Sequence, residues 1–213
     1  SFGLSPACLV VAGTTDGCAS FLATGAAEVG DGVTALGSTL TLKLLSDAPV
    51  FAPRFGVYSH RLCSRWLVGG ASNTGGKALL RFLTAEQMAA LTPLLEPERP
   101  TGYGWHPLPG RGERFPVADP GMIFEPEPLP DDEVRLFQGL LEGIAEVEAR
   151  AYGVIRDLGG PALRSVRTVG GGAANPGWTR IRSRLLGVPM PPATSVEAAY
   201  GTALLARQGC TRG

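Results

Sequence analysis

Asp16 stands among glycines and small hydroxyl residues in the stretch Ala12–Gly17, directly after a short apolar run. That run, Cys8–Gly13, predicts a buried strand ending in a loop, and Gly17–Gly25 predicts a helix of small residues. The Asp16 carboxylate would then project into a cleft at the helix N-terminus. A carboxylate placed there can accept the proton of an alcohol that attacks a phosphoryl group. The same place also suits an N-cap, for which Asp is a preferred residue.

A second candidate is the group Gly37, Ser38 and Thr39, which lies inside the strand-like segment Val33–Leu45. A hairpin of this composition can turn backbone N–H groups and hydroxyls toward phosphate oxygens. Hairpins of Gly, Ser and Thr that bind no ligand are also common, so this group alone does not decide its role.

Gly75 and Gly76 precede Lys77 in a glycine-rich stretch that resembles a phosphate-binding loop. The stretch lacks the G-x-x-x-x-G-K-[ST] spacing, and Ala78 occupies the place of the metal-binding hydroxyl. It is therefore not a Walker A motif. We interpret it as a glycine turn before a helix that lines a nucleotide cleft, with a purely structural turn as the alternative.

Three consecutive glycines, Gly170, Gly171 and Gly172, follow the strand-like segment Arg164–Val169. Glycines at such a turn allow another molecule to approach the backbone before the next helix begins. Asn175 could hydrogen-bond a purine edge or a ribose, and Trp178 could pack on the ring. Packing within the protein would explain this tryptophan equally well.

The remaining elements surround these candidates. Residues 96–130 are crowded with Pro, Gly and Arg, which predicts a long surface excursion with little regular structure. Apolar periodicity predicts one long helix over Asp131–Leu158, stopped by glycines. Strand and helix patterns also cover Gly56–Arg61, Trp66–Ala71, Thr74–Leu95, Pro176–Leu186 and Ser195–Arg207. Strands that feed glycine turns opening onto helices predict an α/β domain with a mixed sheet.

Charge and length exclude several classes of protein. The chain has 213 residues, and its 19 Lys and Arg balance 19 Asp and Glu, so there is no positive field to hold nucleic acid or an acidic membrane. No apolar run reaches the roughly 20 residues that a bilayer crossing needs, which predicts a soluble, intracellular protein. The scattered cysteines disfavour structural zinc and are expected to be buried and reduced: Cys8, Cys18, Cys63 and Cys210.

Taken in order, four stretches resemble the second half of the FGGY carbohydrate kinases: Gly13–Asp16, Gly37–Thr39, Gly170–Trp178 and Glu197–Ala206. The similarity spans almost the entire chain. It looks closest to the pentulose branch, which includes xylulose kinases and the plant and cyanobacterial D-ribulose kinases. Gly112–Pro116 also resembles the D-ribulose kinase group.

The resemblance implies that residues 1–213 form the C-terminal lobe of a ribonuclease H-like, actin-like ATPase fold, with a mixed sheet flanked by helices. It implies Asp16 as the catalytic base, Ser38 and Thr39 with Gly37 facing the ATP phosphates, and Gly75 and Gly76 lining the nucleotide cleft. It also implies an adenosine pocket formed by Gly170, Gly171, Gly172, Ala173, Asn175 and Trp178. Mg²⁺ is expected with ATP, and its ligands cannot be assigned from the sequence.

The resemblance has one departure. The family's N-terminal lobe supplies an Asp-x-Gly-Thr phosphate loop and most sugar contacts, and this chain has no such stretch. We therefore expect a fragment, or a partner chain that provides the missing lobe, and a chain that alone binds nucleotide weakly and phosphorylates nothing. The expected substrate is a ketopentose such as D-ribulose or D-xylulose, in the cytoplasm or, in a plant, the plastid stroma. The alternatives are an actin-like or heat-shock-like ATPase switch and an inactive sugar-binding paralogue.

Overall fold

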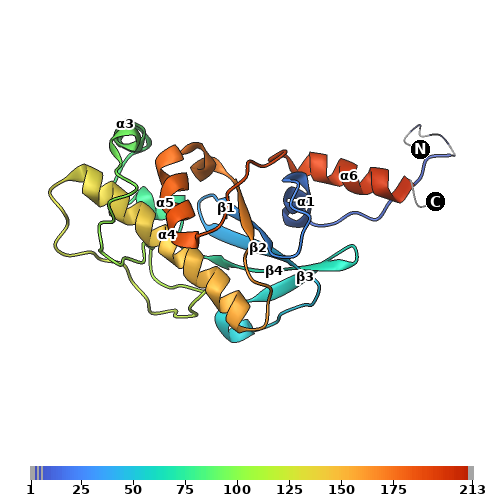
Figure 1. The fold of residues 1–213 in the computed structure, drawn as a ribbon, viewed down its shortest axis with the longest axis horizontal. Helices are drawn as coiled ribbons and strands as arrows, with labels where there is room; N and C mark the ends of the chain where they lie inside the picture. Colours follow the sequence, from blue (N-terminus) through green and yellow to red (C-terminus); the bar gives the residue numbers. More distant parts are fainter. Residues whose placement is uncertain (1–2, 4, 6, 211–213) are drawn as a thin grey trace.

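A five-stranded mixed sheet forms the centre of the computed structural model, which describes residues 3, 5 and 7–210 (Figure 1). The strands lie in the order β3-β4-β2-β1-β5. β1 and β5 are parallel, and the other neighbours are antiparallel. The strand bounds are Asp31–Leu36 for β1, Leu40–Ser46 for β2, Tyr58–Leu62 for β3, Arg65–Ser72 for β4 and Ser165–Val169 for β5.

Helices cover both faces of this sheet (Figure 1). On one face, α4 (Glu133–Asp157) buries apolar side chains against Leu42 and Leu44 of β2, and α5 (Pro176–Leu186) packs beside α4. On the other face, α1 (Asp16–Ala23) packs on Leu45, and α6 (Ala198–Cys210) lies along α1. Alternate residues of a strand point to opposite faces, which is why neighbouring leucines of β2 serve different helices. The predicted α/β class with a mixed sheet is confirmed.

The long helix α4 has the ends that its sequence predicts. The side chain of Asp132 accepts hydrogen bonds from the N–H groups of Val134 and Arg135, so Asp132 is the N-cap. The helix stops before Gly159, whose φ of +91° belongs to the left-handed region that glycine tolerates best. Its buried stripe provides much of the largest apolar cluster, including Phe137, Leu140 and Leu141.

Shorter elements connect the sheet to α4. Thr84 and Gln87 form a capping box at the start of α3. Residues 96–130 are all described and contain turns and one isolated bridge, between Glu113 and Asp119, without a helix or strand. The short elements are α2 (Gly76–Leu79), α3 (Ala85–Leu91) and single 3₁₀ turns at Pro53–Phe55, Thr92–Leu94 and Gly171–Ala174.

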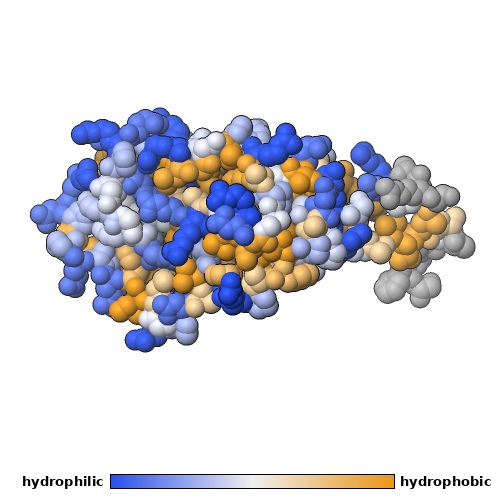
Figure 2. Space-filling model, turned by 60° about the horizontal axis from the view of Figure 1, so that its bottom comes forward, coloured by the Kyte–Doolittle hydropathy of each residue, from blue (hydrophilic) through white to orange (hydrophobic). Residues whose placement is uncertain are grey.

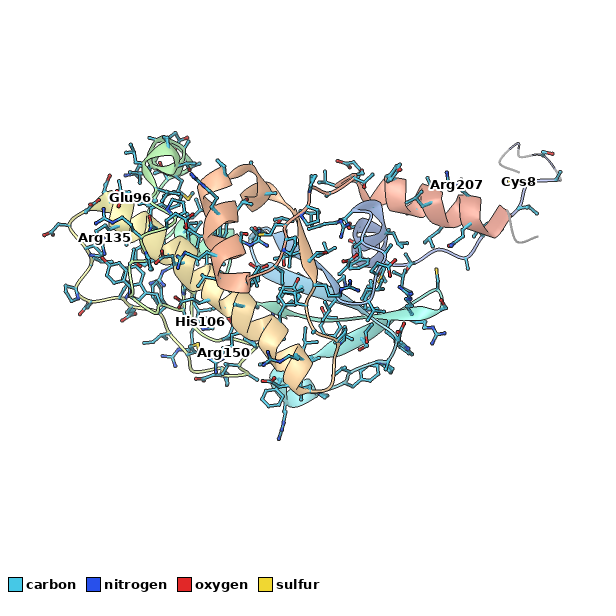
Figure 3. The ribbon with its side chains drawn as sticks, viewed as in Figure 1. Cys8, Glu96, His106, Arg135, Arg150 and Arg207 are labelled. Atoms are coloured by element: carbon cyan, nitrogen blue, oxygen red, sulfur yellow. The ribbon has the colours of Figure 1, made fainter. Side chains whose placement is uncertain are left out.

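The predicted buried strand at Cys8–Gly13 is wrong. These residues form no strand, and the side chains of Leu9 and Val10 are 63% and 97% exposed. The segment pairs with no strand in the part of the chain that the structure describes, and an unpaired strand leaves its backbone groups without ladder partners. It runs instead beside the end of α6, at the end of the molecule where Cys8 and Arg207 are labelled (Figure 3), and Val11 lies against Gly209.

The expectation of buried cysteines holds for Cys18 and is wrong for Cys8 and Cys63, which are exposed. Large apolar side chains such as Phe51 and Leu80 are also exposed. Figure 2 shows hydrophobic surface across the middle of one face of the molecule. None of the helices within the described ranges is long and apolar enough to cross a bilayer.

Candidate functional site

A cavity of about 440 Å³ opens where β1 ends, between the β1–β2 hairpin, α2 and the turn before α5. This volume is in the range of small-molecule sites. Glycine backbone forms one wall and apolar side chains form the other. The lining residues are Leu36, Gly37, Ser38, Gly76, Lys77, Leu79, Leu80, Met88, Phe137, Leu141, Gly171, Gly172, Asn175 and Trp178.

The β1–β2 hairpin and the glycine turn before α2 are joined through their backbones. The N–H of Gly76 donates to the carbonyl of Gly37 at 2.8 Å, and the N–H of Lys77 donates to the carbonyl of Ser38 at 3.2 Å. Gly75 has a φ of +138°, and a Cβ atom there would stand 2.8 Å from the backbone of Thr39. Only glycine at position 75 allows the two backbones to come this close, so the turn before α2 packs directly on the β1–β2 hairpin.

The triple-glycine turn packs on the end of β1. Gly170 has a φ of +87°, and an added Cβ would lie 2.7 Å from the carbonyl oxygen of Leu36. At Gly172 it would lie 2.6 Å from the ring of Trp178 and 2.7 Å from Leu36, whereas at Gly171 nothing lies within 4 Å. Of the three glycines, only Gly171 has free space around the position of a Cβ atom. Gly172 packs beside Trp178 and forms the floor of the cavity.

Asn175 and Trp178 both make hydrogen bonds within the protein. The side-chain oxygen of Asn175 accepts from the N–H of Trp178 at 2.9 Å, and its amide donates to Thr92 at 3.0 Å, so Asn175 caps α5. Trp178 is 3% exposed, and its indole N–H donates to the carbonyl of Leu141. Both residues line the cavity while also holding α5 against α3 and α4.

The cavity thus brings together seven of the residues expected from the sequence, from three separate turns: Gly37, Ser38, Gly76, Gly171, Gly172, Asn175 and Trp178. Thr39, Gly75, Gly170 and Ala173 belong to the same turns but do not line it. Sequence reasoning missed Lys77, Met88, Phe137 and Leu141. A cation beside Gly75 and Gly76 was a usable signal for Lys77, whereas Phe137 and Leu141 look like ordinary core positions of a long helix.

Asp16 is not among the cavity-lining residues. It is exposed and is the first residue of α1, and Thr15 occupies the cap position. One carboxylate oxygen of Asp16 accepts from the N–H of Gly17 at 2.7 Å. The helix N-terminus around this carboxylate carries partial positive charge, which favours an anionic group there.

Three ionisable side chains lie on the sheet face under α1. Burial lowers the pKa of Lys43, against the opposing effects of Cys18 and Asp16, and the pKa of His60 is lowered by burial and by the nearby Lys43 charge. Burial also raises the pKa of Tyr58. The carboxylate of Asp16 is therefore close enough to Lys43, on the sheet face under α1, to influence its pKa.

A buried ionic network fixes the triple-glycine turn relative to β1. The fully buried guanidinium of Arg182 (α5) donates to both carboxylate oxygens of Glu148 (α4) at 2.6 and 2.7 Å and to Thr168 (β5) at 2.7 Å. Glu148 also accepts from Thr34 (β1), whose hydroxyl lies 3.0 Å from that of Tyr152. Four elements are therefore joined directly beneath the end of β1.

A second buried carboxylate attaches the 96–130 excursion to β4. Glu113 accepts hydrogen bonds from the Ser72 hydroxyl and the Asn73 N–H, and it lies 2.7 Å from Nε2 of His106, which Figure 3 labels beside α4. Burial raises the pKa of Glu113, but the bonds from His106, Ser72 and the backbone outweigh it and leave the pKa below the ordinary value. The end of β4 leads directly into Gly75.

Metal ligands are not assembled by this chain in the residues that can be described: no group of three or more His, Cys, Asp or Glu there could hold an ion. The cavity is lined by backbone amides, one amide side chain, one hydroxyl, one lysine and apolar groups. This set suits an organic ligand with a phosphate tail better than a bare cation.

The mixed sheet, its helices on both faces and a cavity walled by glycine turns define an α/β domain with a site of small-molecule size at one edge of its sheet. A family profile described as the C-terminal domain of the FGGY family of carbohydrate kinases matches residues 26–208. The chain belongs to this family. Its fold is therefore the ribonuclease H-like, actin-like ATPase fold expected from the resemblance.

Solved structures agree with this assignment. The chain is similar to a xylulose kinase from Brucella ovis, with 24% identity and a TM-score of 0.81 over 93% of this chain and 43% of that one. It is also similar to a xylulose kinase from Bifidobacterium adolescentis, with 20% identity and a TM-score of 0.78 over 99% of this chain and 43% of that one. A xylulose kinase from Rhodospirillum rubrum matches with 25% identity and a TM-score of 0.73 over 92% of this chain and 41% of that one. The chain thus spans less than half the length of the structures it matches.

Proposed function

We propose that this chain is the C-terminal, nucleotide-binding half of a kinase that transfers a phosphoryl group from ATP to a sugar hydroxyl. The observation that carries the proposal is the cavity at the end of β1, where glycines of three turns meet apolar side chains from α3 and α4. An adenine ring fits against apolar walls, and exposed backbone N–H groups with a hydroxyl suit phosphate oxygens. Membership of a carbohydrate kinase family supports the same chemistry.

In this proposal Gly37, Ser38 and Thr39 face the ATP phosphates, and Gly75 and Gly76 line the cleft beside them. The adenosine lies against Gly170, Gly171, Gly172, Ala173, Asn175 and Trp178. Asn175 retains a second amide hydrogen and a second lone pair beyond the two bonds already described, so it can still bind a purine or a ribose. Trp178 contributes the edge of its buried ring to the wall of the pocket and does not stack freely.

Asp16 is proposed as the general base. Its exposed carboxylate at the start of α1 can accept the proton of a sugar hydroxyl as that oxygen attacks the γ-phosphoryl group. The bond between the γ-phosphorus and the bridging oxygen of ADP breaks as the new phosphorus–oxygen bond forms. Mg²⁺ would arrive with the nucleotide, bound mainly to phosphate oxygens, and would neutralise charge on them.

A ketopentose such as D-ribulose or D-xylulose is the proposed substrate. Likeness to the three xylulose kinases supports this class, although at 20–25% identity the likeness alone does not fix a substrate. The sugar contacts are assigned to an N-terminal lobe, either in the same polypeptide or in a partner. Without that lobe the alcohol is neither aligned nor shielded from water, so the chain alone is expected to bind nucleotide weakly and to transfer nothing at a useful rate.

Two measurements test the proposal. Titration calorimetry of the chain with ADP should detect binding, and Gly172→Ala should weaken it. In a two-lobe enzyme that includes this chain, Asp16→Asn should lower kcat by about 100-fold or more and leave ADP binding unchanged. Asp157→Asn, at an exposed position of α4, is the matched control. Full transfer activity in Asp16→Asn would refute the base assignment, and ATP hydrolysis that no sugar stimulates would favour the ATPase switch.

A further inference from the structure

Lys43 occupies an unusual place for a lysine, in the middle strand of the sheet. Thr41, Lys43 and Leu45 of β2 point to the face that α1 covers, because Leu45 packs there and side chains alternate along a strand. Lys43 pairs with Val33 of β1 and Gly69 of β4 across the sheet. Its side chain is half-buried.

The Lys43 side chain reaches the first turn of α1. A Cβ atom added to Gly17 would stand 3.3 Å from Cε and 3.5 Å from Nζ of Lys43. The N–H of the same Gly17 donates to the carboxylate of Asp16 at 2.7 Å. The end of the Lys43 side chain and the carboxylate of Asp16 therefore both lie beside Gly17.

Nothing in the immediate structure accounts for a cation at this position. Within the described residues no carboxylate lies within 4.0 Å of Lys43, so the lysine forms no direct ion pair. Burial disfavours its charge and lowers the pKa of Lys43, against the opposing effects of Cys18 and Asp16. The start of α1 also carries partial positive charge, which does not favour a cation there. The other titratable groups on this face are Tyr58 and His60.

The choice of lysine is also selective. The chain has two lysines, Lys43 and Lys77, among 19 basic residues. Lys77 lines the nucleotide cavity, and Lys43 lies beside the residue that we assign as the base. A charge that destabilises its own position, next to a carboxylate at a candidate site, is a signature of function.

We propose that Lys43 is a positioning residue for Asp16, an inference that rests on the proposed function. Its ammonium attracts the carboxylate from beneath α1 and fixes the direction in which the carboxylate faces the sugar hydroxyl. Gly17 leaves room for the end of the lysine, since a Cβ atom there would make a tight contact with Cε of Lys43. The effect on transfer comes from alignment of the base and needs no contact between Lys43 and the sugar.

The first test uses this chain and side-chain NMR. With two lysines, Lys43 gives a resolved Cε and Nζ signal in ¹³C,¹⁵N-lysine-labelled protein, and Lys43→Met identifies it. The pKa of Lys43 should fall below its value in the unchanged protein when Asp16→Asn removes the opposing charge, and Asp157→Asn should leave it unchanged. An unchanged Lys43 pKa in Asp16→Asn would overturn the proposal.

The second test measures kinetics of the two-lobe enzyme. Lys43→Met should lower kcat by about 10- to 100-fold, leave the KM for ATP within about twofold, and keep or raise the Tm, because a partly buried charge is removed. Lys43→Arg should recover part of kcat. In the Asp16→Asn background Lys43→Met should cause no further loss. An unchanged kcat, a loss that adds to that of Asp16→Asn, or a KM that rises as much as kcat falls would each overturn the positioning role.

The two tests separate this inference from the proposed function. Retained transfer activity in Asp16→Asn would reject Asp16 as the base, and the positioning role would then fail with it even if the NMR coupling were observed. Loss of activity in Asp16→Asn with normal kcat in Lys43→Met would leave the proposed function intact and reject Lys43 alone.

Discussion

Replacing Arg182 by methionine should severely destabilise the domain, because it removes one partner of a fully buried ion pair. Arg182 and Glu148 are each inaccessible to solvent, and the guanidinium makes two bonds to the carboxylate and one to Thr168. In Arg182→Met the Glu148 carboxylate keeps the hydroxyl of Thr34 and loses its counter-charge. Breaking a buried pair in this way costs about 3–5 kcal/mol.

This cost is a large fraction of the roughly 5–15 kcal/mol by which domains are stable. For a chain of this length it corresponds to a fall in Tm on the order of 10 °C. Urea denaturation followed by circular dichroism measures it directly. Arg150→Met, at an exposed position of α4, the helix that carries Glu148 (Figure 3), is the matched control and should change stability by less than about 0.5 kcal/mol.

The double variant Glu148→Leu with Arg182→Met decides whether an unpaired charge is the cause. Replacing both partners by apolar residues of similar size removes the buried carboxylate, so most of the lost stability should return. A loss under about 1 kcal/mol in Arg182→Met would refute the reasoning. So would a double variant as unstable as the sum of the single variants, since the pair would then have no coupling.

Two further predictions follow from the site. Gly172→Ala places a Cβ atom 2.6 Å from the Trp178 ring and should weaken ADP binding about tenfold by calorimetry, whereas Gly153→Ala, on α4 and outside the cavity lining, meets nothing within 4 Å and should bind normally. The pKa of Glu113 is lowered on folding from the ordinary 4.5, so its stabilisation is complete above about pH 5 and is lost as the pH falls through the lowered value. Acid unfolding monitored by fluorescence should therefore have a shallower pH slope in Glu113→Gln.

The outcomes that contradict these two predictions are equally specific. Equal ADP affinities for Gly153→Ala and Gly172→Ala would show that the floor of the cavity does not contact the nucleotide. The same acid slope with and without the Glu113 carboxylate would show that other carboxyl groups control acid unfolding.

Local signals predicted most of the fold. Pro176 after Asn175, the Thr84 capping box and the glycines after α4 determine where helices begin and end within a few residues, so these elements needed no tertiary information. The strand predicted at Cys8–Gly13 was wrong because it depended on tertiary pairing, which local sequence does not reveal. Apolar runs predict burial only where a partner surface exists, and the described part of this chain provides no strand to pair with this segment.

The parts of the candidate site that depend on backbone geometry were predictable from the sequence. The parts that depend on side chains from distant segments were not. Glycine clusters mark Gly37, Gly76 and Gly172, because close approaches exclude other residues. Glu148 and Arg182 gave no such signal, since a charged residue on an amphipathic helix normally faces water and their pairing depends on how α4 and α5 pack. Lys43 was hidden in the same way, as one polar residue in a strand that mixes polar and apolar positions.

The structure also separates the cavity from Asp16, which limits where the proposed transfer could take place. The cavity lies at the start of β2, whereas Asp16 lies near Lys43, three residues further along the strand and on the face that α1 covers. At about 3.3 Å per residue, that offset is about 10 Å, far more than the 3–3.5 Å at which reacting atoms must meet. Under the proposed function, a nucleotide in the cavity would therefore extend its phosphates past Ser38 and around the end of the sheet toward α1. We expect a triphosphate to have the length for this path and AMP to bind the cavity without reaching Asp16, the proposed base.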